Sequence, residues 1–372
     1  MSNFIPVNQP LLNGNEAKYL NECITSGWIS SEGPFVEKFE TGIAKLTGRK
    51  HAIAVSNGTA ALDVAIESLG IVAGDEVIVP SFTIISCLQQ IVRLGAIPVV
   101  VDSDLCTWNV DVSKIEEKIT SKTKAIMVVH TYGLPVDMKT VIEIAERYSL
   151  KIIEDAAEMI GQTYCGKPCG SFGNISTLSF YPNKHVTTGE GGMVLTDSDE
   201  LASECKSLRN LCFKSNERFV HERMGWNFRM SNLQAAVGVA QLEQLSKFVV
   251  KKRYIGKMYS DLLSKTDGIQ LPLAETSYAQ NIYWVFGILI NKSHSLDAKE
   301  AMSRLESKGI GCRPFFYPMH QQPVFKKMGL FNGEVHHNSE LMYEKGFYIP
   351  SGLNLDETQI NRVAGEVRSL FI

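Results

Sequence analysis

Short apolar runs alternate through residue 195 with longer segments whose apolar positions recur every three or four residues. The short runs predict buried strands, and the periodic segments predict amphipathic helices. We expect strands at 51–55, 76–79, 97–101, 125–129, 151–154, 175–180 and 193–195. We expect helices between them at 59–69, 86–94 and 138–148. Continuous apolar strands alternating with helices indicate an α/β fold with a mostly parallel, seven-stranded sheet covered on both faces.

A second pattern begins near residue 231. A helical periodicity runs from Ser231 toward Leu263, and a strand-like stretch at 283–290 and a helical one at 298–308 follow it. At 372 residues the chain has the length of about two ordinary domains. We therefore expect a large domain at 1–245 and a smaller α+β domain at 246–372, linked by the long helix.

The composition is that of a globular protein, with 44% hydrophobic and 21% charged residues. The formal net charge of -3 offers no basic surface for nucleic acid or for an anionic membrane. The start of the chain does not resemble a signal peptide, and no apolar run approaches the roughly 18 residues of a membrane span. These features predict a cytoplasmic protein.

The eight cysteines are scattered along the chain, as in proteins of a reducing compartment. The closest pair, Cys165 and Cys169, lacks the second Cys/His pair that a structural zinc site needs. We expect no metal site there, and a hairpin turn at 166–168 instead.

Lys184 is the most informative residue. It follows the apolar run 175–181, and Pro182 should end that strand because proline cannot donate to a central ladder. Lys184 is thus expected on a loop at a strand end, where α/β folds place their chemistry. A lysine there can form a Schiff base with a carbonyl compound, including the aldehyde of pyridoxal phosphate. The alternative for any single lysine is a solvated surface position.

Three further segments fit the same chemistry, each with an ordinary structural alternative. Residues 56–59 join the first strand to a helix, whose free N–H groups would attract a phosphate; Asn57 or Thr59 could instead be a simple N-cap. Asp155 follows the strand 151–154 and could keep a pyridine nitrogen protonated, or could cap a turn. Ser179 could donate to the same phosphate, or be a polar strand residue.

These segments agree in order and spacing with a known family. Over nearly its whole length the chain resembles the nucleotide-sugar aminotransferases, the DegT/DnrJ/EryC-like family of pyridoxal-phosphate enzymes. The resemblance implies an aspartate aminotransferase-like fold (fold type I). It rests on residues 56–62 (SNGTAAL), 74–83 (GDEVIVPSFT), 154–158 (EDAAE), 188–192 (TGEGG), 229–236 (RMSNLQAA) and 313–320 (RPFFYPMH).

The resemblance also implies the cofactor, pyridoxal 5'-phosphate, and the residues that bind it. Lys184 would hold it covalently, Asp155 would pair with its ring nitrogen, and Glu158 would lie near its ring hydroxyl. Asn227 would reach the phosphate of a partner subunit, which implies a homodimer with shared active sites. The full implied set is Gly58, Thr59, Ile84, Asp155, Glu158, Ser179, Lys184 and Asn227.

The implied reaction moves an amino group from L-glutamate to a nucleotide-linked 4-keto-6-deoxyhexose, with Lys184 as the acid–base catalyst. Segments 7–10, 27–31 and 101–104 are most similar to the perosamine-forming members. This implies a GDP-linked substrate and a part in O-antigen (lipopolysaccharide) biosynthesis. The aromatic members of the pocket set could instead be core residues, and its histidine a hydrogen-bonded loop residue. The residues expected to line the sugar-nucleotide pocket are Trp28, Ser30, Arg313, Tyr317 and His320.

Four positions, at three places in the chain, depart from the family pattern. Ile84 stands where relatives carry an aromatic residue stacked on the cofactor ring, so aliphatic contact or Phe82 would have to replace that stack. Glu158 stands where many members have glutamine, although the perosamine-forming members also carry glutamate. Tyr181 with Pro182 replaces a Phe-Gly pair of the perosamine-forming members. The last difference leaves the choice of sugar open.

Other functions remain as alternatives. A UDP- or dTDP-linked ketosugar could replace the GDP-linked one. A sugar 3-dehydratase of the same fold would carry histidine in place of Lys184. A non-catalytic regulator that binds pyridoxal phosphate would need a DNA-binding extension, and no basic segment of that kind precedes the fold.

Overall fold

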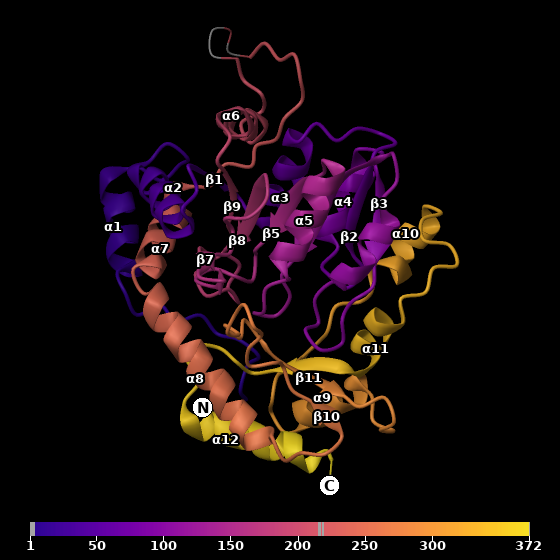
Figure 1. Ribbon diagram of the computed structural model, residues 1–372. Coiled ribbons are helices and arrows are strands. Elements are labelled where there is room, and N and C mark those ends of the chain that lie inside the picture. Colours follow the sequence, from indigo (N-terminus) through magenta and orange to yellow (C-terminus); the bar gives the residue numbers. More distant parts are fainter. Residues whose placement is uncertain (1–3, 215–216, 218, 372) are drawn as a thin grey trace.

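A seven-stranded sheet forms the centre of the large domain (Figure 1). The computed structural model describes residues 4–214, 217 and 219–371. The strand order is β1-β9-β8-β5-β4-β2-β3; β9 is antiparallel to both of its neighbours, and the other pairs are parallel. The expected mostly parallel sheet is therefore confirmed. Its strands are β1 (His51–Val55), β2 (Glu76–Pro80), β3 (Ile97–Val101), β4 (Thr123–Val129), β5 (Lys151–Asp155), β8 (Ile175–Ser179) and β9 (Gly192–Thr196).

Helices cover both faces of this sheet, which explains why its strands are apolar throughout. Along β4, Ala125 and Met127 pack into one core, whereas Ile126 and Val128 pack into the core of the opposite face. Alternate residues of a strand point to opposite faces, so both sets must be apolar. The large-domain helices are α1 (Glu16–Ser26), α2 (Pro34–Thr47), α3 (Gly58–Ser68), α4 (Ser86–Arg93), α5 (Met138–Tyr148), α6 (Asp199–Leu208) and α7 (Asn232–Leu242).

The single helix expected from 231 to 263 is two helices. A capping box of Ser231 and Gln234 begins α7, which ends at Leu242. After a turn at 243–244, α8 (Leu245–Leu263) descends to the small domain (Figure 1). The expected hairpin at 166–168 is present as β6 (Thr163–Tyr164) and β7 (Lys167–Pro168).

The small domain is built on a four-stranded antiparallel sheet of order β10-β11-β13-β12. Its strands are β10 (Ile269–Gln270), β11 (Phe286–Ile290), β12 (Arg313–Pro314) and β13 (Gly346–Ile349). Its helices are α9 (Ala298–Ser307), α11 (His337–Lys345) and α12 (Glu357–Ser369). A further helix in this part of the chain, α10 (Pro323–Lys327), packs against the large domain. No helix within 4–214, 217 and 219–371 is long and apolar enough to cross a membrane.

Two segments cross the domain boundary expected at residue 245, which stays a prediction. Ile5 forms a β-bridge with Ile310 and is buried in the small-domain core. In the other direction, Phe325 and Phe331 pack into a core of the large domain. The core of each domain thus contains residues from the other domain's part of the sequence.

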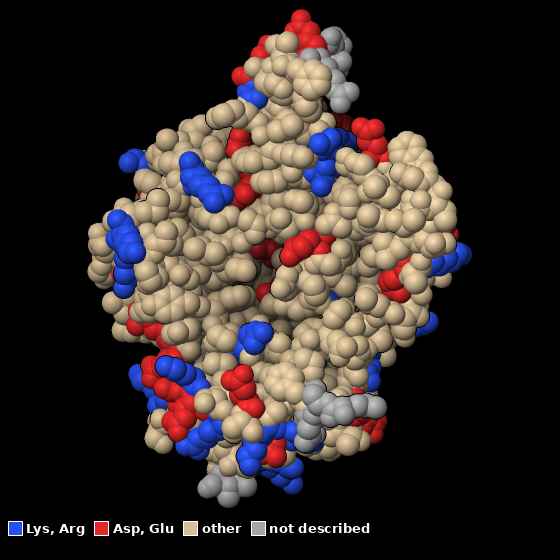
Figure 2. All heavy atoms as spheres, turned by 180° about the vertical axis from the view of Figure 1, so that it is seen from behind, with Lys and Arg blue, Asp and Glu red and all other residues tan. Residues whose placement is uncertain are grey.

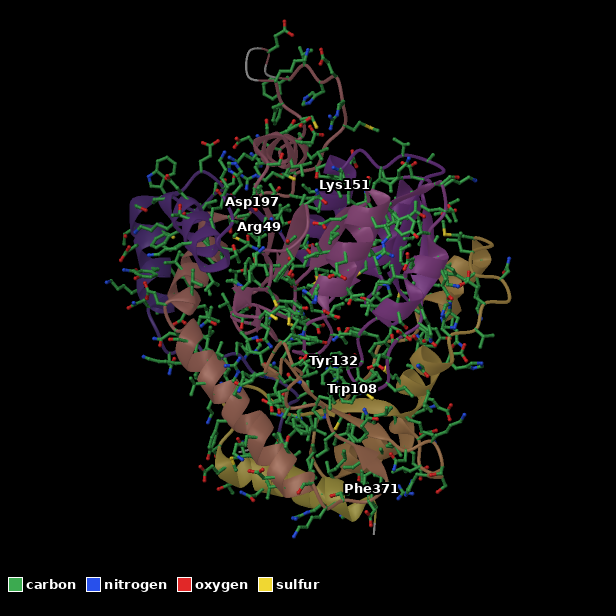
Figure 3. The ribbon with its side chains drawn as sticks, in the orientation of Figure 1. Arg49, Trp108, Tyr132, Lys151, Asp197 and Phe371 are labelled. Atoms are coloured by element: carbon green, nitrogen blue, oxygen red, sulfur yellow. The ribbon has the colours of Figure 1, made fainter. Side chains whose placement is uncertain are left out.

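An aromatic cluster joins the small domain to the carboxyl edge of the large sheet. The Phe315 ring lies 5.1 Å from Trp108 and 4.8 Å from Tyr132, centroid to centroid. Figure 3 shows Trp108 and Tyr132 side by side at this junction. Phe82, just beyond β2, meets Tyr132 edge-on at 5.8 Å. Rings of this size dominate the energy of the surfaces they join, so this cluster sets how the two domains meet.

Candidate active site

A cavity of ≈ 760 Å³ opens where the strands of the large sheet end and the small domain begins. Its walls contain the residues at or just past the carboxyl ends of β4, β5 and β8, and the first turns of α3 and α4. The small domain contributes Trp284, Phe316 and Tyr348. The back face of the molecule is hollowed near its middle, with acidic side chains beside the hollow (Figure 2). Ligands of open α/β sheets bind at this edge, so the cavity is the first candidate site.

Lys184 lies in the turn that follows β8, and its backbone N–H donates to the carbonyl of Tyr181 at 2.9 Å. Its side chain is only 10% exposed and reaches the cavity. The Nζ atom lies 3.8 Å from the centroid of the Trp284 ring and 3.9 Å from Oε1 of Glu158. Burial lowers the pKa of Lys184, while the charges of Glu158 and Asp155 oppose that shift. A buried amine with a lowered pKa is a better nucleophile at neutral pH.

Asp155 ends β5 and is 3% exposed. Its Oδ1 accepts a hydrogen bond from the backbone N–H of Ala157 at 3.0 Å. Its Oδ2 accepts a weaker one from the Cys87 thiol at 3.3 Å. Burial raises its pKa, and these hydrogen bonds and the Lys184 charge oppose the rise. The Thr177 hydroxyl donates a further weak hydrogen bond to Oδ1, at 3.4 Å. A buried carboxylate with these three donors still has a lone-pair position left for a cationic partner.

Glu158 lies one turn further along the chain and is 7% exposed. Its Oε2 accepts a hydrogen bond from the backbone N–H of Tyr132 at 2.7 Å. Burial raises the pKa of Glu158 to about 8, although the nearby Lys184 ammonium opposes the rise. Burial therefore shifts both members of the Lys184–Glu158 pair toward their neutral forms, and it outweighs their mutual attraction.

The opposite end of the cavity is a helix start. Asn57 caps α3 by accepting from the backbone N–H of Ala60 at 2.8 Å, which leaves the N–H groups of Gly58 and Thr59 without that cap. Gly58 approaches β8 so closely that an added Cβ would lie 2.8 Å from Cβ of Ser179. Gly58, Thr59 and Ser179 all line the cavity. This arrangement of N–H and hydroxyl donors at the positive end of a helix dipole suits a phosphate.

The comparisons with known proteins agree with this geometry. The family model described as the DegT/DnrJ/EryC1/StrS aminotransferase family matches residues 10–368. The chain belongs to this aminotransferase family. It is 39% identical to GDP-perosamine synthase of Vibrio cholerae over 368 residues, or 99% of each chain. It is 40% identical to GDP-perosamine synthase of Escherichia coli O157:H7, again over 99% of each chain.

A solved structure of an aminotransferase extends the agreement to the whole fold. The aminotransferase from Psychrobacter cryohalolentis superposes with a TM-score of 0.92 at 28% sequence identity. The match covers 99% of this chain and 98% of the other. The α/β aminotransferase architecture expected from the sequence is thereby confirmed.

Three family-implied residues lie outside the cavity of their own chain. Asn227 is exposed, and its Oδ1 accepts from Nε of Arg229 at 3.0 Å. Trp28 is 52% exposed, and Ser30 is exposed two residues later. Both residues follow α1 and are held by Asn232. The Trp28 carbonyl accepts a hydrogen bond from the side-chain amide of Asn232, and the Ser30 carbonyl accepts one from the backbone N–H of Asn232. Within one chain these three residues do not meet Lys184.

The segment 313–320 is only partly at the site. Arg313 lines a smaller side cavity of ≈ 220 Å³ that shares Tyr181, Asn183 and Tyr348 with the main one. Tyr317 packs edge-on against Tyr343. His320 is 1% exposed, and its ring is hydrogen-bonded to Ser81 and to Glu340, each at 2.8 Å. His320 therefore has the geometry of a hydrogen-bonded structural histidine, and it does not reach the cavity.

Ile84 lines the cavity and is 47% exposed, whereas Phe82 is buried in the aromatic cluster. Phe82 is therefore not in place to cover a ring bound in the cavity. Sequence reasoning missed Trp284, whose ring lies over the Lys184 ammonium and whose indole N–H donates to the carbonyl of Asn183 at 2.9 Å. In the sequence, Trp284 is marked only by its place in an apolar run, and a tryptophan of the protein core would have the same surroundings.

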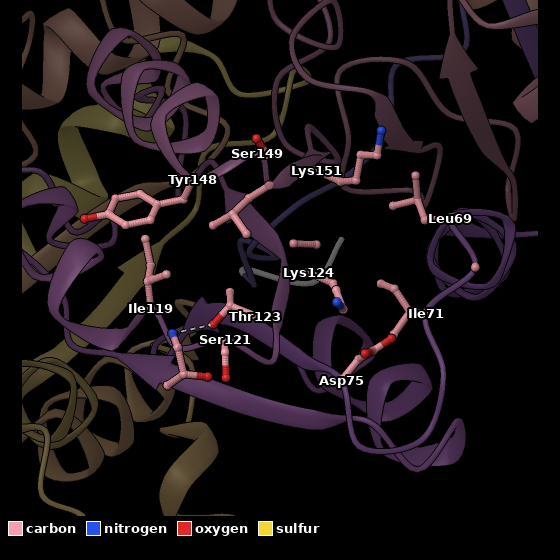
Figure 4. Close-up of a pocket in the computed structure, with 14 residues that line it drawn as sticks. Leu69, Ile71, Asp75, Ile119, Ser121, Thr123, Lys124, Tyr148, Ser149 and Lys151 are labelled. Carbon is pink, nitrogen blue, oxygen red and sulfur yellow. Dashed lines mark hydrogen bonds between the residues drawn. The ribbon is translucent and has the colours of Figure 1, made fainter.

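A second cavity of ≈ 460 Å³ lies on the opposite edge of the sheet (Figure 4). Lys124 and Lys151 enter it from the amino ends of β4 and β5. Leu69 and Tyr148 come from the carboxyl ends of α3 and α5, where lysines complement the negative end of the helix dipole.

One buried cluster has the donor types of a metal site. Ligand atoms of His130, Glu154 and Cys169 lie within 4.8 Å of one another. The Glu154 carboxylate, however, accepts from His130 at 3.1 Å, from Ser176 at 2.8 Å and from two backbone N–H groups. These bonds make it a structural carboxylate that ties β5 to the loop after it.

Proposed function

We propose that this protein is a pyridoxal-phosphate-dependent aminotransferase that moves an amino group from L-glutamate to a GDP-linked 4-keto-6-deoxyhexose, as in perosamine synthesis. The observation that carries the proposal is the pairing of Lys184 and Asp155 in one cavity at neighbouring strand ends. The residues fit the cofactor: an amine, a buried carboxylate and a helix start are the groups its aldehyde, ring nitrogen and phosphate require. When bound, pyridoxal phosphate supplies that aldehyde and a ring that accepts electrons.

Lys184 has two tasks in this proposal. Its Nζ would hold the cofactor between turnovers, and the amine freed by the amino donor would carry a proton between the carbon atoms that exchange the amino group. Burial lowers the pKa of Lys184, which favours the neutral amine that can accept a proton. The Trp284 ring, 3.8 Å from Nζ, covers the amine and restricts water on that side.

Asp155 and Glu158 would act on different groups of the cofactor. Asp155, fixed by Ala157 and the Cys87 thiol, would keep the ring nitrogen protonated, because a cation beside a buried carboxylate is strongly favoured. Glu158 is anchored by the Tyr132 N–H, and its pKa of about 8 allows it to be protonated or ionised near neutrality. It can therefore share a proton with a neighbouring hydroxyl.

The substrate assignment rests on the relatives. GDP-perosamine synthases from two bacteria share 39% and 40% identity with this chain over 99% of its length. The side cavity at Arg313 opens beside Tyr181 and Asn183, next to Lys184, and offers a guanidinium for an anionic substrate group. The proposed donor and acceptor each carry such a group.

We also propose a homodimer with shared sites. Asn227, Trp28 and Ser30 are exposed and outside the cavity of their own chain. A partner subunit would bring its copies of these residues to the phosphate end and to the sugar pocket. Sedimentation of the purified protein should therefore give a dimer.

The proposal is tested with purified protein loaded with pyridoxal phosphate. L-glutamate and a panel of GDP-, UDP- and dTDP-linked ketosugars are supplied, and the amino sugar and 2-oxoglutarate are measured by mass spectrometry. We expect amination of the GDP-linked 4-ketosugar. If only a UDP- or dTDP-linked sugar is aminated, that nucleotide takes the place of GDP in the substrate assignment. Loss of a sugar hydroxyl without amination would indicate a dehydratase. Cofactor binding without turnover on any sugar would contradict the enzyme assignment.

A further inference from the structure

A small polar cavity lies behind the catalytic turn, on the side of Lys184 away from the main cavity. It measures ≈ 10 Å³. Asn183, Lys184 and His185 form one wall, residues 8–10 of the N-terminal segment another, and Lys252 of α8 a third. Leu353 completes the lining, so four parts of the chain that are remote in sequence meet beside the proposed catalytic lysine.

Two side chains at this cavity carry buried polar atoms without a hydrogen-bond partner within the described residues. His185 is 2% exposed, and neither of its ring nitrogens has a partner. The amide oxygen of Asn183 has none either. Polar atoms buried in this way are costly unless paired, and where native proteins retain them a bound water is the usual partner.

The charge state of His185 suits a neutral partner. Burial and the nearby charges of Lys252 and Lys184 lower the pKa of the imidazole far below its usual range. The Ile282 carbonyl opposes part of this shift, but it lies outside hydrogen-bonding geometry with the ring. Neutral imidazole offers one N–H donor and one acceptor nitrogen.

The size and lining of the cavity suit one water molecule. A single water needs roughly 10–15 Å³ of such space and two to four polar partners. The Lys252 ammonium already donates to the carbonyls of Trp284 at 2.8 Å and Ser351 at 2.7 Å. The unpaired groups left are the imidazole N–H, the acceptor nitrogen of the same ring and the amide oxygen of Asn183. One water can accept from the imidazole N–H and donate to the Asn183 oxygen.

We propose that this cavity binds one structural water shared by His185 and Asn183, and that His185 acts through it as a positioning residue for Lys184. The positioning role rests on the proposed function, whereas the water site does not. The turn is already held from two sides, since the Asn183 carbonyl accepts from the Asn8 amide at 3.2 Å and from the Trp284 indole at 2.9 Å. The water secures the third side.

The water site is tested first on the apoprotein. A high-resolution crystal structure should show one ordered water within hydrogen-bond distance of the His185 ring and of the Asn183 amide oxygen. Amide hydrogen exchange across residues 183–186 should be faster in His185→Leu than in the wild type, and close to wild type in His185→Asn, which keeps a donor and an acceptor. A dry cavity together with unchanged exchange would overturn the proposal.

The positioning role is tested on the loaded enzyme. In His185→Leu we expect kcat to fall about tenfold, the rate equivalent of one lost hydrogen bond, with KM for both substrates unchanged. The pH midpoint of the bound cofactor's visible absorbance should also shift, because Lys184 is held less firmly, and His185→Asn should restore both values. His337→Leu, at an exposed histidine of α11, is the matched control.

The outcomes separate the two proposals. An unchanged kcat and an unchanged pH midpoint in folded His185→Leu would refute the positioning role. If His185→Leu does not fold, the wild-type crystal structure and His185→Asn still decide whether the water is present. If the wild-type protein aminates no sugar, the proposed function fails while the crystallographic and exchange results still judge the water site.

Discussion

The approach of α3 to β8 makes Gly58→Ala a sharp test of the phosphate end of the site. An added Cβ would lie 2.8 Å from Cβ of Ser179 and 3.0 Å from its Oγ. The two carbon atoms would have to separate by roughly 0.6 Å, from 2.8 to 3.4 Å, to reach ordinary contact. Ser179 belongs to β8, between two neighbouring strands, so its Cβ cannot swing away. The start of α3 must move instead.

Overpacking of this kind costs about 1–3 kcal/mol. Because the shift displaces the N–H groups proposed to bind phosphate, we expect cofactor affinity to fall by roughly 5- to 150-fold, the same energy expressed as a binding constant. The assay is a titration of the apoprotein with pyridoxal phosphate followed by absorbance, with thermal unfolding of the apoprotein measured alongside.

The double variant Gly58→Ala/Ser179→Gly isolates the clash. Removing the Ser179 side chain costs a proposed phosphate donor but gives the new methyl group room. Gly58→Ala should therefore be far less damaging in the Ser179→Gly background than in the wild type, a coupling that a double-mutant cycle measures. Gly365→Ala is the control, since nothing lies within 4 Å of its added Cβ in α12. Additive losses, or a wild-type affinity for Gly58→Ala, would refute the reasoning.

The other predictions concern residues around the proposed ring. Borohydride reduction and peptide mapping should place the cofactor on Lys184, and Lys184→Ala should abolish amination; a label on another lysine would contradict this. Asp155→Ala should lower kcat at least about a hundredfold, near 3 kcal/mol, and a near-normal rate in a folded variant would exclude the role. Ile84→Tyr should raise cofactor affinity several-fold through stacking worth about 1 kcal/mol, so an unchanged affinity in the titration would show that Ile84 does not face the ring. The pKa of Glu158 is raised to about 8 in the folded apoprotein, so the folded state holds this proton more tightly than the unfolded state does. The resulting contribution to folding stability is complete below about pH 4 and is lost as the pH rises toward 8. Glu158→Gln should therefore gain thermal stability over the wild type between pH 5 and pH 9, and parallel pH curves of the melting temperature would count against the shifted pKa.

The large sheet could be predicted from sequence because its strands are buried on both faces. In β4, both alternating sets of side chains pack into cores, so the whole strand is an apolar run. The same logic brought Asp155 and Lys184 together, since adjacent parallel strands end at one edge of the sheet. Asp155 is the last residue of β5, and Lys184 follows the end of β8. The break between α7 and α8 at 243–244 could not be predicted from the sequence, because Glu243 and Gln244 are both good helix formers. The break depends on the direction that α8 takes toward the small domain.

The remaining residues of the site are brought to it by the packing of the small domain against the large one. Trp284, Phe316 and Tyr348 reach the cavity from the small domain, through contacts between segments far apart in the chain. No local pattern distinguishes them from core aromatics. His320 shows the opposite case: its motif suggested a pocket residue, but its bonds to Ser81 and Glu340 are set by packing that the sequence does not display.

The crossing of the N-terminal segment has a consequence for how the chain folds. Ile5 pairs with Ile310, the Val7 carbonyl accepts from the Ser351 N–H, and the Pro10 carbonyl accepts from the Asn354 amide. During synthesis residues 5–10 cannot find these partners until the chain through residues 310–354 has left the ribosome. Closing so long a loop is slow, so the segment should be among the last to settle. Since the Asn8 amide also donates to the Asn183 carbonyl, the turn that carries Lys184 should acquire its final shape only after this segment has paired with residues 310–354.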